Sequence, residues 1–257
     1  MTDFELAVSS EMVFTELPII ERVRRIHDMG FAVEIWSWHD KDLAALAATG
    51  ARFTSMTGYL HGDLIDPVSC DEVVRTAELS VKAAETLGVS RLNLHTSELV
   101  DGKAARPRQR ATGEMWLTAQ RTLERIGDLG AQTGVQFCVE NLNTIVDHPG
   151  VPLARAKDTL ALIEGVGHPN VKMMLDLYHA QIGEGNLIEL IRRCGDAIGE
   201  IQVADVPGRC EPGTGEINYP AIAKALREIG FTGTVGMEAW ASGDSVAALD
   251  AFRSAFS

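Results

Sequence analysis

The chain has 257 residues, of which 46% are hydrophobic and 23% are charged, so it can bury a sizeable core. This length suits one α/β barrel or two ordinary domains. The formal net charge of −13 and the pI near 5.0 argue against sequence-independent nucleic-acid binding, which needs clustered lysine and arginine.

The first residues and the cysteines predict the compartment. The chain begins MTDFELAVSSE, without a basic region followed by an apolar run, and no stretch of about 18 apolar residues could span a bilayer. The four cysteines are widely spaced and form no C-x-x-C pair: Cys70, Cys138, Cys194 and Cys210. We therefore expect a cytoplasmic protein with reduced thiols, without a membrane partner, a disulfide framework or a zinc knuckle.

Short apolar, β-branched runs alternate with longer amphipathic segments along the whole chain. The runs that predict strands lie near residues 4–9, 32–37, 51–57, 91–95, 135–140, 171–177, 198–204 and 234–239. The segments that predict helices lie near residues 16–29, 40–48, 69–87, 109–133, 153–164, 186–194, 218–229 and 244–256. Strands that alternate with helices are typical of βαβ units around a parallel sheet.

Glycines close most of the helical segments shortly before the next strand, where a helix end favours a positive φ. They are Gly30, Gly50, Gly88, Gly134, Gly165, Gly195 and Gly230. The longest non-periodic stretches, 97–108, 141–152 and 205–217, instead follow strands. We predict a single (β/α)8 TIM barrel over residues 1–257, with its working face at the carboxyl ends of the strands. A doubly wound open sheet is the alternative, but no G-x-G-x-x-G follows the first strand.

Each of the last four predicted strands carries a polar residue near its carboxyl end. These residues are Glu140, Asp176, Gln202 and Glu238. Three desolvated carboxylates at one barrel mouth would repel one another, and a divalent cation would remove that cost. Their oxygen ligands favour Mg²⁺ or Mn²⁺ over Zn²⁺. The simpler alternative is that these are strand-end acids paired with nearby basic residues.

Two further side chains are candidates for binding a substrate. His179 follows the sixth predicted strand closely and could reach a substrate oxygen, or it could be a rim histidine bonded to a carboxylate. His61 and His95 follow other strands and are weaker candidates. The segment 205–217 is rich in glycine and proline and contains Arg209, whose guanidinium can bind a carboxylate through two hydrogen bonds.

Three segments carry a resemblance to a known family. The run IQVADVPGRCEPGTGEINYP, with LDLYH before it and VGMEAW after it, resembles the hydroxypyruvate isomerase family. That family belongs to the xylose isomerase-like TIM barrels, which include ketose 3-epimerases and a branch of DNA-repair endonucleases. The pattern from Ala204 to Tyr219 is specific, and the resemblance is densest from Glu140 to Trp240.

The resemblance implies roles for the strand-end residues. The paired catalytic glutamates of the family fall on Glu140 and Glu238, and its metal positions fall on Glu140, Asp176, Gln202 and Glu238. Epimerase relatives usually have histidine where Gln202 stands, so the glutamine favours a hydroxypyruvate isomerase-like protein. The spacing from Glu140 to Asp147 departs from the family pattern by one residue, and we assign Asp147 no role.

The resemblance also implies a reaction. An isomerase of the aldose–ketose type would interconvert a small 2-oxo or hydroxy acid and its aldehyde isomer, as hydroxypyruvate and tartronate semialdehyde interconvert, through an enediolate. One glutamate would remove the proton and the other would return it to the adjacent carbon. We expect Arg209 to hold the substrate carboxylate and His179 to polarise a carbonyl or hydroxyl.

Other functions stay open. A ketose 3-epimerase or an isomerase of four-carbon oxo acids would use the same pair of glutamates, whereas a sugar-acid binding protein would exchange no substrate proton with solvent. A DNA-repair nuclease should show a basic groove and a histidine-rich zinc site, and neither is apparent. Homo-oligomers are common in this group, but no sequence feature fixes one.

Overall fold

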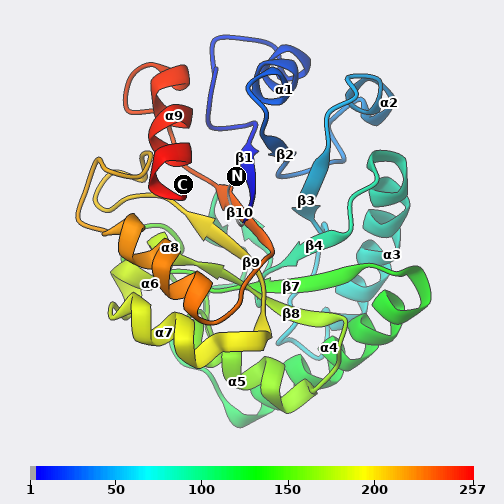
Figure 1. The fold of residues 1–257 in the computed structure, drawn as a ribbon. Helices are drawn as coiled ribbons and strands as arrows, with labels where there is room; N and C mark the ends of the chain where they lie inside the picture. Colours follow the sequence, from blue (N-terminus) through cyan, green and yellow to red (C-terminus); the bar gives the residue numbers. More distant parts are fainter. Residues whose placement is uncertain (1–3) are drawn as a thin grey trace.

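A closed, eight-stranded parallel barrel forms the centre of the protein in the computed structural model, which describes residues 4–257 (Figure 1). In order around the barrel, the strands are β1 (Glu5–Ser9), β10 (Thr234–Met237), β9 (Ile198–Val203), β8 (Val171–Asp176), β7 (Gln136–Glu140), β4 (Arg91–Leu94), β3 (Phe53–Thr57) and β2 (Ala32–Glu34). Every neighbouring pair is parallel. The predicted TIM barrel is confirmed, and only residues 1–3 of the predicted domain lie outside the described residues.

Helices surround the barrel on its outer side (Figure 1). They are α1 (Ile19–Asp28), α2 (Leu43–Ala47), α3 (Cys70–Leu87), α4 (Gly113–Thr133), α5 (Ala156–Val166), α6 (Leu177–Gly183), α7 (Leu187–Cys194), the 3₁₀ helix η1 (Gly195–Ala197), α8 (Tyr219–Glu228) and α9 (Ser245–Ala255). Among the described residues, no helix is both long enough and apolar enough to cross a membrane.

One predicted helix end was wrong. Helix α5 runs through Gly165 to Val166 and ends at Gly167, whose φ of +60° is the left-handed conformation that glycine favours. The prediction placed the end at the first glycine after the apolar period, although a glycine inside a helix costs only about 1 kcal/mol.

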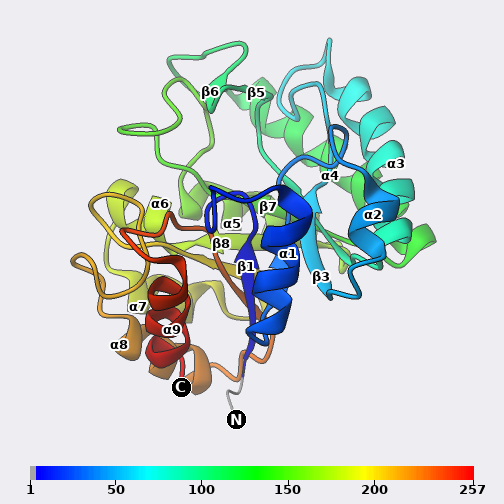
Figure 2. The same ribbon diagram turned by 90° about the horizontal axis from the view of Figure 1, so that it is seen from above.

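Helix α6, the 3₁₀ helix η1 and a short hairpin were not predicted at all. Helix α6 begins where the sixth strand was expected to continue, and the side chain of Asp176 caps it by accepting a hydrogen bond from the backbone N–H of His179 at 2.7 Å. The segment 97–108 contains a short antiparallel hairpin of β5 (Leu99–Val100) and β6 (Lys103–Ala104). Figure 2 shows this hairpin at the opposite end of the molecule from the two termini.

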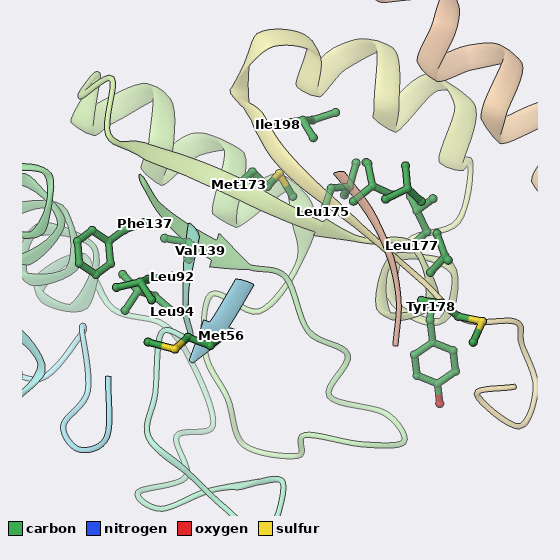
Figure 3. Packing of buried hydrophobic residues seen from close by; sticks show 14 of the residues in the cluster. Met56, Leu92, Leu94, Phe137, Val139, Met173, Leu175, Leu177, Tyr178 and Ile198 are labelled. Carbon is green, nitrogen blue, oxygen red and sulfur yellow. The ribbon is translucent and has the colours of Figure 1, made fainter. Parts of the chain in front are cut away.

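The strands separate an apolar outer layer from a polar interior. Along β7, Phe137 and Val139 belong to the buried apolar cluster that joins the barrel to its helices, and Phe137 pairs with Leu92 of β4 (Figure 3). The alternate residues Cys138 and Glu140 face the barrel axis, because side chains alternate across a strand. The apolar layer therefore stabilises the barrel while the interior remains available for polar groups.

This layering predicts a large loss of stability when Phe137 is truncated. Because its ring is fully buried, Phe137→Ala should lower the free energy of unfolding by about 3–5 kcal/mol. Urea denaturation followed by circular dichroism measures the change. The matched control is Leu117→Ala on the exposed side of α4, where we expect a change within about 0.5 kcal/mol. Equal effects of the two substitutions would contradict the assignment of the core.

Candidate active site

A cavity of about 740 Å³ opens at the carboxyl ends of the strands. Glu140, at the end of β7, and Glu238, directly after β10, both line it, as do His179 and Arg209. A smaller hollow of about 30 Å³, enough for one or two water molecules, is lined by Glu140, Gln202 and Glu238. Strands β8 and β9 separate β7 from β10 in the barrel wall, so the two glutamates reach a shared space from different strands.

The carboxylate of Glu140 is held through one of its two oxygens. Its Oε2 lies 2.5 Å from Asn93 Nδ2 and 3.0 Å from His95 Nε2. Burial acts to raise the pKa of Glu140, but the hydrogen bond and charge of His95, followed by the hydrogen bond of Asn93, outweigh it, so the pKa lies below its ordinary value. Oε1 takes no part in these two bonds and lies 4.0 Å from His179 Nε2. Glu140 therefore presents an ionised oxygen to the site.

Glu238 has a different environment. Its Oε2 accepts a hydrogen bond from Arg209 Nη2 at 2.6 Å. Burial nevertheless raises the pKa of Glu238, and although Arg209 opposes this rise, the charge of Glu140 adds to it. Arg209 itself stacks over the ring of Tyr178 at 5.2 Å, and its buried Nε has no hydrogen-bond partner. Glu238 and Arg209 are therefore bonded to each other, and both line the cavity.

The hydrogen bonds around His179 fix its tautomer. Asn143 accepts backbone N–H groups through Oδ1, so its Nδ2 must be the atom that lies 2.8 Å from His179 Nδ1. His179 Nδ1 is therefore an acceptor and the proton lies on Nε2, which is buried without a partner. Burial, together with the charge of Arg209, lowers the pKa of His179 well below its ordinary value and keeps the ring neutral. His179 consequently offers an N–H donor to the site.

Two of the four predicted metal ligands, Glu140 and Asp176, belong to a group of side chains that could hold a metal ion, whereas Glu238 lies outside that group and is bonded to Arg209. Glu140, Asp176 and His179 can each offer one atom within 4.8 Å of the others, but the proton on Nε2 makes His179 a donor in this hydrogen-bond network. Gln202 Oε1 is buried without a partner. Burial, followed by the charge of Glu140, raises the pKa of Asp176 well above its ordinary value. A cation held by oxygens of Glu140, Asp176, Gln202 and Glu238 would relieve this repulsion and satisfy the unpartnered amide oxygen.

The sequence analysis underestimated or missed several residues of the interior. Asn93 was not considered, and His95, which was only a weak candidate, contacts Glu140 directly. Both lie at the end of β4, where the strand-end pattern could have found them. The buried acids Glu34 and Glu200 lie beneath the site, and Gln202 donates from Nε2 to both, at 3.0 and 3.1 Å. Glu34 also ends a strand, whereas Glu200 lies inside β9 and gives no such signal.

The segment 205–217, which carries Arg209, is held by one buried carboxylate. Asp205 Oδ1 accepts the backbone N–H groups of Val206 and Ile217 at 2.9 and 3.0 Å, and Oδ2 accepts that of Gly213 at 2.9 Å. Three charge-assisted bonds to its own loop make Asp205 the anchor that positions Arg209 beside Glu238.

A polar cavity at the carboxyl ends of the strands is where TIM-barrel enzymes have their active sites. The family model described as "Xylose isomerase-like TIM barrel" matches residues 23–255, and the chain belongs to this family.

Named relatives agree with this assignment. The chain is 33% identical to the putative hydroxypyruvate isomerase of Homo sapiens over 69% of its length, and the match spans 63% of the human protein. It is 30% identical to the putative hydroxypyruvate isomerase of Streptomyces coelicolor, over 92% of this chain and 90% of that protein. It is 29% identical to the 2-oxo-tetronate isomerase of Haemophilus influenzae, over 97% and 98% of the two chains.

A solved structure has the same fold over almost the whole chain. It is described as AP endonuclease, family 2, from Brucella melitensis, with a TM-score of 0.85, 27% identity and 99% of each chain covered. The predicted resemblance is therefore confirmed at the level of the family.

The anchoring of the 205–217 segment can be tested by limited proteolysis. Asp205→Ala removes the acceptor of three backbone N–H groups, so the segment should open more often and trypsin should cut after Arg209 at least about tenfold faster. Mass spectrometry of the fragments identifies the site of cleavage. Glu85→Ala, which removes an exposed carboxyl group of α3, is the control and should be cut at the wild-type rate. Equal rates for both variants would show that Asp205 does not hold the segment.

Proposed function

We propose that this protein is an isomerase that interconverts a small 2-oxo or hydroxy acid and its aldehyde isomer, with Glu140 and Glu238 as the acid–base pair. The observation that carries the proposal is that these two carboxyl groups line one cavity from different strands, with the N–H of His179 beside them. The names of the relatives, hydroxypyruvate isomerase and 2-oxo-tetronate isomerase, support a substrate of this class.

The two glutamates divide the proton transfer between them. Glu140, whose pKa is lowered, is ionised and removes a proton from the carbon next to the carbonyl through its free Oε1. Glu238, whose pKa is raised, holds a proton more readily and delivers one to the neighbouring carbon. The carbon that loses the proton carries a hydroxyl group, and the carbon that gains one is the former carbonyl carbon. The hydroxyl proton passes to the former carbonyl oxygen, so the carbonyl is regenerated on the other carbon and no atom or electron is gained or lost. Exchange with solvent then returns Glu140 to its ionised form and Glu238 to its protonated form.

Other side chains bind and orient the substrate. The Nε2–H group of His179 donates to the carbonyl or hydroxyl oxygen, and Arg209, whose Nε has no partner, binds the substrate carboxylate. Glu140, Asp176, Gln202 and Glu238 would hold Mg²⁺ or Mn²⁺. When bound, this cation would supply stabilisation of the negative charge that develops on the substrate.

The size of the cavity favours a second candidate within the same chemistry. A volume of about 740 Å³ is far more than a three-carbon acid needs, so a four-carbon oxo acid or a ketose also fits. A ketose 3-epimerase would use the same pair of glutamates. Hydrogen exchange with D₂O, screened over hydroxy-carbonyl compounds of three to six carbons, distinguishes these substrates by the compound that exchanges fastest.

Glu238→Gln tests the acid–base pair. The glutamine keeps the shape and a hydrogen-bond acceptor for Arg209 but cannot transfer a proton, so turnover and deuterium incorporation should fall between about 10²- and 10⁴-fold. Mass spectrometry of the recovered substrate measures the incorporation. Asp101→Asn, at the exposed rim of the same cavity, is the control and should retain activity. Appreciable exchange by Glu238→Gln would end the two-glutamate mechanism.

Removal of divalent cations tests the metal. After EDTA treatment and dialysis, deuterium incorporation should fall by at least about tenfold, and Mg²⁺ or Mn²⁺ should restore it, because hard oxygen donors prefer these ions. Circular dichroism before and after EDTA controls for unfolding. Full activity in protein shown by elemental analysis to be free of metal would rule out a required cation.

A further inference from the structure

Two acidic side chains lie inside the barrel, below the residues of the proposed reaction. Glu34 ends β2 and Glu200 lies in β9, and both are fully or almost fully buried. Both carboxyl groups accept hydrogen bonds from Gln202, and Ser55 Oγ donates to Glu200 Oε1 at 2.9 Å. Neither group reaches the large cavity, and the proposed reaction uses neither. Burial of two acids lowers the stability of the fold, so we looked for a functional role that accounts for their position.

The two acids fix the orientation of the Gln202 side chain. One nitrogen, Gln202 Nε2, lies 3.0 Å from Glu34 Oε2 and 3.1 Å from Glu200 Oε1. Carboxyl oxygens in these positions accept hydrogen bonds, so the amino group of the amide must face them and uses both of its hydrogens. The carbonyl oxygen, Oε1, then has to point away from the two acids. It is buried and has no partner.

The backbone opposite Gln202 makes room for this arrangement. Gly236 of β10 pairs with Gln202 in the sheet register. A Cβ atom at Gly236 would lie 2.2 Å from Glu34 Oε1 and 2.5 Å from Glu34 Oε2, closer than any real contact. The glycine therefore admits the Glu34 carboxyl group to the position from which it accepts the Gln202 amide.

We propose that Glu34 and Glu200 are positioning residues that hold the Gln202 amide with its oxygen directed at the cation position. The inference rests on the proposed cation of the preceding subsection. Gln202 lines the small hollow together with Glu140 and Glu238, and its backbone pairs in register with Asp176, so the residue is a neighbour of the other predicted oxygen donors. Without the two acids, the amide could turn and present Nε2, which repels a cation.

The test is a double-mutant cycle on Mn²⁺ affinity, measured by isothermal titration calorimetry on metal-free protein. Glu200→Met keeps the volume of the side chain but removes an acceptor, and we expect the dissociation constant for Mn²⁺ to rise about tenfold or more. Gln202→Met should weaken binding at least as much. Glu200→Met added to Gln202→Met should change nothing further, because Glu200 acts only through the amide. Glu200→Gln retains a carbonyl acceptor and should restore most of the affinity.

Controls separate positioning from a general loss of structure. Thr54→Val removes a buried hydroxyl group of β3 that donates to the backbone carbonyl of Val33 and does not contact Gln202. This variant should leave the Mn²⁺ affinity unchanged. If Glu200→Met does not fold, Glu34→Met provides the same cycle from the other acceptor.

Four results would overturn the proposal in distinguishable ways. Unchanged affinity in folded Glu200→Met, or losses that add in the double variant, would show that the acids do not act through Gln202 and would leave the isomerase proposal intact. Absence of Mn²⁺ binding by the wild-type protein would remove the cation from both proposals. If Thr54→Val also lost Mn²⁺ affinity, the loss in Glu200→Met would be explained by a general destabilisation of the barrel.

Discussion

The burial of several carboxyl groups at one end of the barrel is the constraint on which the rest of the site depends. Transfer out of water penalises each charged form, and every neighbouring acid adds to that penalty. The pKa of Asp176 and the pKa of Glu238 are both raised for this reason. Removing one partner of a buried charge lowers the free energy of unfolding by about 3–5 kcal/mol. The acids, their hydrogen-bond donors and a bound cation therefore depend on one another.

Glu140 and Glu238 differ in proton affinity because their neighbours differ. Glu140 has two donors on one oxygen, and these lower its pKa despite burial. Glu238 has one cationic partner, Arg209, and its pKa remains raised. A pair of acids whose proton affinities differ suits a transfer between adjacent carbons. The difference comes from the surroundings, since both residues are glutamates on the same cavity.

The fold could be predicted because its signals are local. Each strand and helix is defined by a period of two or of about 3.6 within a short window, and the long segments all follow strands. The errors fell where a local signal conflicted with tertiary structure. Gly165 was interpreted as a helix end but lies inside α5, and α6 begins at the end of β8 because Asp176 caps it. The hairpin in 97–108 is too short to show a period.

The site was predictable only in part, because its decisive contacts join distant segments. The strand-end pattern identified Glu140 and Glu238, but it was applied only to the last four strands. It therefore passed over Asn93 of β4 and left His95, directly after that strand, a weak candidate. The tautomer of His179 depends on a side chain 36 residues away, and no motif encodes it. Barrel closure creates these neighbours, and closure is a property of the whole chain.

A single strand shows how the barrel separates stability from chemistry. Along β7, Phe137 and Val139 pack outward against the helices, while Cys138 and Glu140 face the axis. Outward residues contribute apolar burial that does not depend on the polar groups inside, so the interior can carry charges that would unfold a smaller core. The same alternation lets the interior of β9 hold Gln202 above Glu200. The apolar outer layer stabilises the fold, and the polar inner layer carries the candidate site. Outward substitutions on one strand should therefore change the stability, and inward substitutions should change the activity.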